Sequence, residues 1–568
     1  MKVSDYIVDF LEKKGVKHAY GYQGTMIAHL VESIGKSKIE NHCVYNEQAA
    51  AFAAVGAAKA TGKCAFAYAT SGPGAINLVS GIADAYYDSV PVLFITGQVN
   101  TTEYTGISQL RQQAFQETKV VSIVKDICKY TSFVQTPESI VEEINKAWEI
   151  ANTGRKGPVV LDIPMNVQRA DIDVAQVQQE TIQEEISQDT IDIILNELNA
   201  SKRPVFVLGN GVGKDCTSRN RVKELIKRYR VPVITTLLGK DLIDTDDELN
   251  MGALGAAYGH RCANLIAYEK ADLIISFGAS LCRRQTGGNT KEFAKNAKII
   301  RIDIDSNELL RTLHDEIHVP YDVNSIIEEI LSVDGSYECK EWLEKCKYIK
   351  KKYEEFDNGC EGREPNKIID EITSRLENNI VVSDVGQHMM WVMQSAHVKN
   401  TRLLFSGGHG AMGFALPAAI GAQIETGKPT MCIAGDGAFQ MNIQELQWVF
   451  REKIPLCMVV FNNSSLGLIR QQQDDFFNSY YVGSTSEGGY LSPDFKKVAE
   501  AYNITSFKVE SISELKSIVS NANMDEPLLI EYVLEPTTVA IPKTYFGETM
   551  VNQRPYVDNE ILEDIKDI

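Results

Sequence analysis

The chain has 568 residues, enough for three domains of ordinary size. It is 44% hydrophobic and 23% charged, which is typical of a globular enzyme and excludes a disordered chain. The formal net charge is −19 and no basic tract offsets it, so nucleic acid and anionic membrane surfaces are excluded as partners. No apolar run approaches the roughly 20 residues that a membrane span needs.

The first twenty residues, MKVSDYIVDFLEKKGVKHAY, predict an amphipathic helix with charges throughout and not a signal peptide. The 11 cysteines include no C-x-x-C pair. They stand mostly inside apolar runs, as do Cys43, Cys64, Cys432 and Cys457. Reduced, buried thiols in a cytoplasmic protein are therefore expected.

The stretch VYNEQAAAFAAVGAAKATGK (44–63) predicts a short strand ending at Glu47 and then an alanine-rich helix ending at Gly62. A helix with so many small residues is expected to pack closely against a neighbour. On local pattern alone, Glu47 is an acid that the helix dipole stabilises in the first turn. The segment TSGPGAINL (70–78) follows the strand CAFAYA and is predicted to be a turn.

Apolar runs alternate with helical patterns along the whole chain, which predicts an α/β fold of three doubly wound, parallel-sheet domains. Two polar stretches, 166–189 and 334–366, are expected to be linkers or surface helices. The predicted domains span 1–168, 188–335 and 366–545, with a tail at 546–568. The expected strands lie in CAFAYAT, PVLFITG and GPVVLDIP, then in RPVFVLGNG, VPVITT, ADLIISFG and KIIRIDID, and last in NIVVSDVG, PTMCIAGDG and LCMVVFNN.

Two patterns in the middle segment are weak. LGNGVG (208–213) follows a strand and could approach a dinucleotide, but a plain strand-to-helix turn explains it equally well. His314 and His318 in LHDEIH have the i, i+4 spacing of a zinc pair. Since nothing nearby supplies a third ligand, we expect two solvated surface histidines.

The stretch CIAGDGAFQMN (432–442) places Asp436 between two glycines at the end of a predicted strand, 430–434. Asn442 and Glu445 resemble a capping box, which predicts a helix over 443–453 that ends before a proline. The next strand, 456–461, is followed by NNSS (462–465).

In a parallel sheet, ligands bind beyond the carboxyl ends of the strands, so Asp436 and the asparagine pair can be neighbours. Their oxygens suit Mg²⁺, which keeps room for a substrate's phosphates. Gly435 and Gly437 leave space for a bulky anion. The alternative is a tight turn with an unrelated Asn-Asn loop; the spacing favours a Mg²⁺–diphosphate site.

Several stretches together resemble the thiamin-diphosphate enzymes, and most of all the acetolactate/acetohydroxyacid synthase catalytic chain. They are YNEQAAAFAAVGAAKATGK, TSGPGAINLVSGIADAYYDSVPVLFITGQ, QQAFQET, VSDVGQHMMW, SGGHGAMGFALPAAIGA, GDGAFQMNIQEL and FNNSSLGLIRQQQ. The resemblance covers nearly the whole chain and is highly specific in combination. It implies a pyrimidine-binding domain, a central domain and a diphosphate-binding domain, in that order.

The resemblance also implies roles for individual residues. Asp436 and Asn463 would hold Mg²⁺ by their side chains and Ser465 by its carbonyl. Glu47 would hydrogen-bond N1′ of the cofactor's aminopyrimidine, and the Gly410 carbonyl would accept from the 4′-amino group. Met412 would be the apolar wedge that bends the cofactor. The remaining implied cofactor contacts are Pro73, Asn77, Val385, Gly386, Gln387, His388, Gly435, Gly437, Ala438 and Leu468.

By the same resemblance, the enzyme would decarboxylate pyruvate and transfer the hydroxyethyl unit to a second carbonyl, giving 2-acetolactate when that acceptor is pyruvate. Gly24, Phe115 and Gln116 match the family's catalytic and acceptor region. The family's glutamate and its Mg²⁺ site come from different subunits, so a homodimer or homotetramer is implied. A regulatory subunit stays undetermined.

The chain departs from the family pattern at three acceptor-pocket positions. The usual Pro-Gly-Gly loop reads YQGTM with Thr25, the usual lysine is Met165, and the tryptophan of biosynthetic enzymes is Gln472. These differences suggest another acceptor preference: pyruvate alone, a keto-sugar nucleotide, or simple drift at a tolerant wall. The alternative activity is that of a pyruvate oxidase or a 2-keto acid decarboxylase. The third hypothesis is a relative that binds ligands without catalysis.

FAD is a second candidate cofactor. The biosynthetic enzymes bind it with a Gly-x-Arg-Phe-Asp-Asp-Arg stretch in the middle domain. Here that stretch reads GASLCRR (278–284), and only Arg284 aligns cleanly. The sequence leaves FAD binding open.

Overall fold

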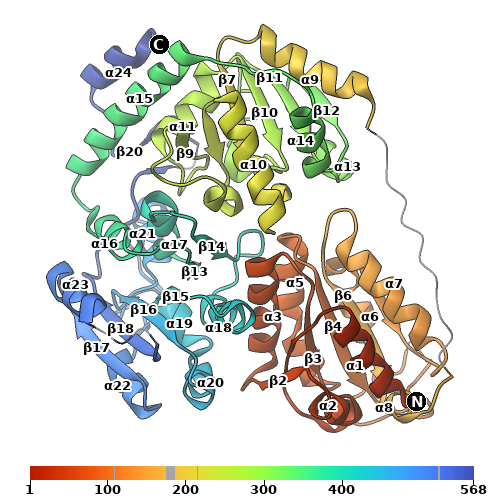
Figure 1. Ribbon diagram of the computed structural model, residues 1–568. Coiled ribbons are helices and arrows are strands. Elements are labelled where there is room, and N and C mark those ends of the chain that lie inside the picture. The colour runs from red at the N-terminus through yellow and green to blue at the C-terminus, as the bar shows by residue number, and fades with distance from the viewer. Residues whose placement is uncertain (108, 174–185, 214, 522, 524, 546) are drawn as a thin grey trace.

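The computed structural model describes residues 1–107, 109–173, 186–213, 215–521, 523, 525–545 and 547–568. The chain forms three α/β bodies, each built around one six-stranded parallel sheet flanked by helices (Figure 1). The α/β fold predicted from the sequence is confirmed. Residues 174–185, half of the predicted linker 166–189, lie outside the described residues, as does one residue of the predicted tail.

The first sheet has the order β2-β1-β3-β4-β6-β5. Its strands are β1 (His18–Gly21), β2 (Glu40–Cys43), β3 (Ala65–Ala69), β4 (Val92–Gln98), β5 (Tyr130–Phe133) and β6 (Val159–Pro164). Its helices and helical turns are α1 (Val3–Lys13), η1 (Thr25–Ile27), α2 (Ala28–Gly35), α3 (Glu47–Thr61), α4 (Pro73–Asn77), α5 (Val79–Tyr87), α6 (Val120–Val124), η2 (Lys125–Ile127), α7 (Ile140–Asn152) and α8 (Met165–Arg169).

The middle sheet has the order β12-β11-β10-β7-β8-β9. Its strands are β7 (Pro204–Leu208), β8 (Val233–Thr235), β9 (Asn250–Ala253), β10 (Leu273–Phe277), β11 (Lys298–Ile302) and β12 (Glu316–Val319). Its helices and helical turns are α9 (Gln188–Ala200), η3 (Asn210–Val212), α10 (Cys216–Tyr229), η4 (Leu237–Leu242), α11 (Arg261–Leu265), η5 (Ile266–Lys270), α12 (Arg283–Thr286), α13 (Ser306–Leu309), α14 (Val323–Ser332) and α15 (Lys340–Gly359).

The third sheet has the order β14-β13-β15-β16-β18-β17. Its strands are β13 (Ile380–Ser383), β14 (Arg402–Phe405), β15 (Thr430–Gly435), β16 (Leu456–Asn462), β17 (Thr505–Val509) and β18 (Leu528–Val533). Its helices and helical turns are α16 (Glu364–Thr373), α17 (Gln387–Ser395), α18 (Ala415–Thr426), α19 (Asp436–Gln440), η6 (Ile443–Glu445), α20 (Leu446–Glu452), α21 (Gly467–Phe476), α22 (Phe495–Ala501) and α23 (Ile512–Asn521).

Counted within their own bodies, the first and third sheets share one strand order, 2-1-3-4-6-5. Their order reverses between the first and third strands, so a crevice opens there beyond the carboxyl ends. The middle sheet reads 3-2-1-4-5-6, the dinucleotide-binding order, and reverses between β7 and β10. The central strands β3 and β10 are buried along their whole length, and β15 at every residue but its last, because helices cover both faces.

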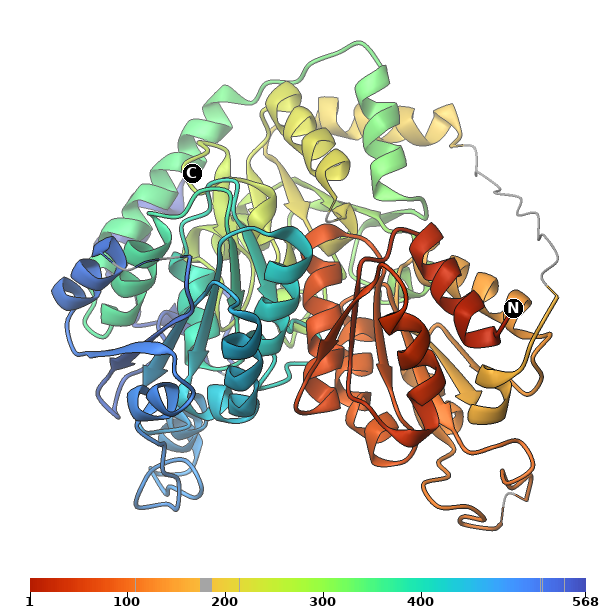
Figure 2. The ribbon, with the colours of Figure 1, turned by 60° about the horizontal axis from the view of Figure 1, so that its bottom comes forward.

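Helices α3 and α18 join the first and third bodies and run side by side in both views (Figures 1 and 2). A Cβ on Gly56 would lie 2.1 Å from the Ala418 carbonyl oxygen, and one on Gly421 would lie 2.0 Å from that of Ala53. The two backbones therefore approach to a distance that only glycine permits. This confirms the expectation that the alanine-rich helix packs closely.

Two local predictions are wrong. The strand before Glu47 ends at Cys43, and Glu47 is the first residue of α3, capped by Asn46. The helix predicted over 443–453 is present as a helical turn, η6, that continues into α20, but the capping box is wrong: the Asn442 side chain makes no cap hydrogen bond and donates instead to the Gly413 carbonyl at 2.7 Å. Tertiary partners outcompete the local capping box.

His318, on β12, is exposed as expected, whereas His314 is half-buried with its Nε2 2.8 Å from the Ala294 carbonyl oxygen. The charged stretch 334–366 mostly forms α15, a surface helix as expected, whose inner side is buried at Trp342 and Ile349. The helix predicted near the N-terminus is α1. Gly62 ends α3 in the left-handed conformation, as predicted.

The remainder of the chain returns to the middle body. A small hairpin joins β19 (Lys543–Thr544) to β20 (Gln553–Arg554), and α24 (Asn559–Lys566) follows. Asp564 of α24 pairs with Lys352 of α15 at 2.8 Å. All eleven cysteines are free thiols. No helix in the described part of the chain is long and apolar enough to cross a membrane.

Candidate functional site

The ends of β15 and β16 meet at the Asp436 carboxylate. Asp436 is 3% exposed and accepts hydrogen bonds from the backbone N–H groups of Gly437 at 2.9 Å and Ser465 at 3.2 Å. Burial, the largest influence, raises the pKa of Asp436 to about 6, although those N–H groups and Tyr490 act against it. A bound cation would favour the charged form, so this buried carboxylate suits a metal site.

The two asparagines after β16 have different surroundings. Asn462 donates to the buried carboxylate of Glu531 at 2.7 Å and accepts from Ser464 and Ser492, so its side chain is occupied within the protein. In the described part of the chain, the Asn463 side chain makes one long hydrogen bond, at 3.3 Å, to Gln387. Of the pair, Asn463 is therefore the side chain with spare capacity for a ligand.

The turn after β13 lies beside this group. His388 is 4% exposed, and its Nε2 has no hydrogen-bond partner among the described residues. Burial lowers the pKa of His388 to about 3, so the ring is neutral at pH 7. A Cβ on Gly435 would lie 3.0 Å from His388 Nδ1. The neutral ring therefore lines the same crevice and has one unsatisfied ring nitrogen there.

Asp384, which the sequence analysis did not select, organises this crevice. Its carboxylate accepts from the backbone N–H groups of Val385 at 2.8 Å, Gly413 at 3.0 Å and Ala415 at 2.8 Å. Burial raises its pKa to about 6. One carboxylate thus links the 385–388 turn to the segment that carries Met412. Its position at the end of β13 was the signal that could have identified it.

The apolar side of the crevice carries Met412 and Leu468, both half-buried. A Cβ on Gly437 would lie 2.4 Å from Leu466 Cδ2 and 3.6 Å from Met412 Cε, so a larger residue would close the space between them. Ala438 is buried, and Gly410 has a φ of +71° with nothing within 4 Å of an added Cβ. The predicted diphosphate-side residues are thus gathered at one switch point.

A second group occupies the matching switch point of the first sheet. Glu47 is 9% exposed and accepts a hydrogen bond from the Asn77 side chain at 2.9 Å. A Cβ on Gly74 would lie 3.0 Å from Glu47 Oε1, and one on Gly24 would lie 2.5 Å from Thr70 Cβ. Pro73 begins α4, so the predicted turn is a helical one. Four predicted residues, Gly24, Glu47, Pro73 and Asn77, therefore lie at this end of one sheet.

A buried ion cluster connects these two groups. Lys59 of α3 lies 2.9 Å from Asp84 and 2.6 Å from Asp88, and it also donates to the Phe405 carbonyl at 2.6 Å. Burial would lower the pKa of Lys59, but the two carboxylates outweigh it and raise it. Asp88 accepts from the backbone N–H groups of Gly407 and Gly408. The cluster thereby fixes the segment that leads to Gly410 and Met412.

The predicted acceptor-region residues are more dispersed. Phe115 is 80% exposed, and Gln116 has a φ of +63°. Their loop is closed by Glu117, whose carboxylate accepts from the backbone N–H groups of Thr105 and Gln113. Gln472 is exposed on α21, one turn after Leu468; Thr25 is exposed and Met165 is half-buried on α8. The single chain thus leaves Phe115, Thr25 and Gln472 open to solvent.

A cavity of about 300 Å³ lies at the switch point of the middle sheet. All three bodies line it, through Lys59, Arg155, Asp215, Arg284, Asp303 and Gly408 among others. The glycines of 208–213 serve the close approach of two loops, since a Cβ on Gly211 would lie 2.7 Å from Gly278 Cα. The cavity rather than the glycine pattern therefore indicates a ligand site.

The first and third sheets have the same strand order, and each carries a buried acid at its switch point: Glu47 in the first and Asp436 in the third. Comparison with known proteins gives the class of enzyme. The N-terminal thiamine pyrophosphate (TPP, thiamin diphosphate) binding domain matches residues 1–123, the central domain of the same enzymes matches 191–330, and their C-terminal TPP binding domain matches 384–532. The chain belongs to the thiamine pyrophosphate enzyme family.

Particular relatives are similar to it over nearly their whole length. The probable acetolactate synthase large subunit of Methanocaldococcus jannaschii is 35% identical, with 97% of this chain and 95% of the relative covered. The acetolactate synthase large subunit of Lactococcus lactis is 34% identical over 95% and 93%. Acetolactate synthase isozyme 2 large subunit of Escherichia coli is 32% identical over 94% and 96%.

Proposed function

We propose that this enzyme decarboxylates pyruvate and transfers the two-carbon unit to a second pyruvate, giving 2-acetolactate. The similarity to acetolactate synthase large subunits carries this proposal, because it extends through all three bodies. When bound, TPP supplies an electron sink for the loss of CO₂ from a 2-keto acid. The test is product analysis after incubation with pyruvate, TPP and Mg²⁺.

The residues present fit a TPP–Mg²⁺ group. Asp436 and the spare oxygen of Asn463 would hold the ion by their side chains, and Ser465 by its carbonyl. Gly386, Gln387 and His388 begin α17, whose N-terminal N–H groups favour a phosphate. His388 Nε2 would gain there the partner that it lacks among the described residues. Gly435 and Gly437 leave the backbone open beside it.

The first body would bind the other end of the cofactor. Glu47 would share a proton with N1′ of the aminopyrimidine, and the Asn77 amide holds that carboxylate in place. Met412 and Leu468 would form the apolar wall against the cofactor, excluding water from the reacting carbon. The Gly410 carbonyl would accept from the 4′-amino group, and Gly24, Phe115 and Gln116 would border the substrate.

We further propose that each complete site combines Glu47 of one chain with Asp436 of a second copy, as the family resemblance implies. Solvent-exposed Phe115, Thr25 and Gln472 on the single chain support this arrangement, since a second copy would cover an open crevice. The relatives carry the name large subunit, which supports a smaller partner chain here too. Eleven free cysteines support a cytoplasmic location.

FAD is proposed as the ligand of the middle cavity. The 3-2-1-4-5-6 strand order and the cavity at its switch point support this proposal. The exposed guanidinium of Arg284 lines the cavity and would pair with a phosphate. Retention of flavin after gel filtration should fall in Arg284→Ala and persist in Arg283→Ala, whose exposed side chain is outside the cavity lining. Equal retention in both variants would contradict the proposed role of Arg284.

A further inference from the structure

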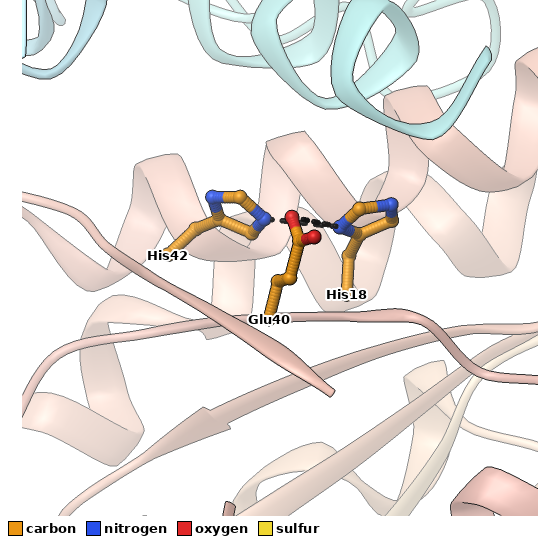
Figure 3. A group of neighbouring side chains, drawn as sticks. All are labelled: His18, Glu40 and His42. Carbon is orange, nitrogen blue, oxygen red and sulfur yellow. Dashed lines mark hydrogen bonds and ion pairs between the residues drawn. The ribbon is translucent and has the colours of Figure 1, made fainter. Parts of the chain in front are cut away.

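Three side chains that the proposed reaction does not use converge at the outer edge of the first sheet. His18 lies on β1, and Glu40 and His42 lie on the neighbouring strand β2 (Figure 3). His18 and Glu40 are register partners, and His42 follows Glu40 by two residues, so all three project from one face. One potential ligand atom from each lies within 4.8 Å of the other two.

The two separations measured from His18 are close to those between ligand atoms around a tetrahedral metal ion. His18 Nδ1 lies 3.1 Å from His42 Nε2 and 3.6 Å from Glu40 Oε2. Bonds of about 2.0–2.1 Å to a tetrahedral ion would place such ligand atoms roughly 3.3 Å apart. Little movement is therefore needed for the three atoms to share one ion. Two imidazoles and one carboxylate suit Zn²⁺ or its analogues and not Mg²⁺.

A fourth residue fixes the orientation of His42. Glu452 of α20 lies 2.7 Å from His42 Nδ1, in the carboxylate–histidine arrangement that holds metal-binding imidazoles. With the proton on Nδ1, His42 Nε2 presents its lone pair toward His18. The Tyr20 ring stacks on His42 at 5.5 Å between centroids and limits its rotation. His42, which is buried, is thus pre-oriented beside the half-buried His18, while Glu40 is exposed and leaves the site accessible.

We propose that His18, Glu40 and His42 bind one divalent transition-metal ion of the zinc type, with Glu452 as the positioning residue. The ion would tie the edge of the first sheet to α20 of the third body through His42. The site is separate from the residues proposed for the reaction, so a catalytic role is not proposed for the ion. Its role would be to stabilise the junction between the first sheet and α20. The site does not depend on the proposed activity.

The test is titration of the full-length protein, prepared without a histidine tag and stripped with a chelator, with Co²⁺ and then Zn²⁺ in excess Mg²⁺. Excess Mg²⁺ would occupy the oxygen site proposed at Asp436, and Co²⁺ reports imidazole ligation by its visible absorption. The wild type should bind one equivalent with that absorption and should unfold at a higher temperature when loaded.

Variants separate a metal site from a simple histidine–histidine hydrogen bond. His18→Gln should weaken Co²⁺ binding more than about 100-fold, and Glu452→Gln about 10–100-fold. Glu40→Gln changes an exposed side chain, so it should fold normally and still weaken binding at least about 10-fold. His318→Gln is the matched control: His318 also lies near a carboxylate, Glu316, at 3.2 Å, and should bind as the wild type does.

Two results would overturn the proposal. One is a wild type that shows no imidazole-type Co²⁺ absorption, which would leave a hydrogen bond from His18 Nδ1 to His42 Nε2 as the whole interaction. The other is equal Co²⁺ affinity in the wild type and the folded Glu40→Gln and His18→Gln variants, which would place the bound ion elsewhere.

Discussion

The Asp436 carboxylate accepts a hydrogen bond from the Ser465 backbone N–H at 3.2 Å and thereby joins the ends of β15 and β16. Asp436→Ala should keep the fold but lose Mg²⁺-dependent TPP binding, because the buried anion that would hold the ion is gone. Isothermal titration calorimetry with TPP and Mg²⁺ measures this directly. An unchanged affinity would contradict the assigned role.

The neighbouring asparagines provide a matched pair. Asn463→Ala should weaken Mg²⁺-dependent cofactor binding by about tenfold or more, since it removes one of the ion's oxygens. Asn462→Ala should instead lower the unfolding temperature, because it leaves the fully buried Glu531 without its amide partner. The opposite assignment, with cofactor affinity lost only in Asn462→Ala, would show that the wrong asparagine has been identified.

Glu47→Gln should bind the cofactor and decarboxylate pyruvate about 10²–10⁴-fold more slowly, the range for loss of a positioned acid or base. Glutamine preserves the shape and the Asn77 contact but cannot exchange the proton. Glu445→Gln is the control, because Glu445 is another buried acid, hydrogen-bonded to the Tyr45 backbone two residues from Glu47. Its turnover should be retained; full activity of Glu47→Gln would refute the role.

If each active site is shared between two copies of the chain, two inactive variants should restore activity when they are mixed. Glu47→Gln and Asp436→Ala should each be inactive, but a mixed dimer contains one site with both native residues. Random mixing of equal amounts should therefore restore about one quarter of the wild-type activity. The measurement is a rate assay after co-refolding or co-expression. If each site formed within one chain, the mixture would stay as inactive as its components.

The sequence predicted the candidate ligand residues of the crevices better than the residues that hold the surrounding loops in place. Asp436 and the asparagine pair could be selected because both follow apolar runs that predict parallel strands, and ligands bind beyond the carboxyl ends of such strands; the choice of Asn463 within the pair came from the family resemblance. Asp384 and the Lys59 cluster were missed, because their partners are backbone N–H groups and carboxylates far away in the chain. The failed capping box at Asn442 has the same cause: distant partners, here the Gly413 carbonyl, override a local pattern.

Lys59→Met should destabilise the protein by about 3–5 kcal/mol, because Asp84 and Asp88 would remain buried without their cation. Lys63→Met, at an exposed position near the end of the same helix, should change the stability by less than about 0.5 kcal/mol. Chemical denaturation of both variants compares them. Similar small effects would mean that the cluster contributes little to holding the two bodies together.

Asp162 should make stability depend on pH. It is 1% exposed, and burial raises its pKa to about 7 although Thr96 and Gln98 donate to it. Because the folded pKa exceeds the unfolded value near 3.8, its favourable contribution is present below about pH 4 and is lost as the pH rises through about 7.

Asp162→Asn removes this titration. Its free energy of unfolding relative to the wild type should therefore rise between pH 4 and pH 8 by up to about 4 kcal/mol. Urea denaturation of both proteins across this range provides the measurement. A difference that stays constant with pH would show that Asp162 does not titrate as its burial implies.

The central claim is tested most directly by the products of the full-length protein with pyruvate, TPP and Mg²⁺. We expect pyruvate to be converted to 2-acetolactate and CO₂ in a 1:1 ratio, and both cofactors to be required, as for a carboligase with pyruvate as donor and acceptor. Release of CO₂ with acetaldehyde or acetate in place of acetolactate would contradict the account and establish a decarboxylase or an oxidase instead.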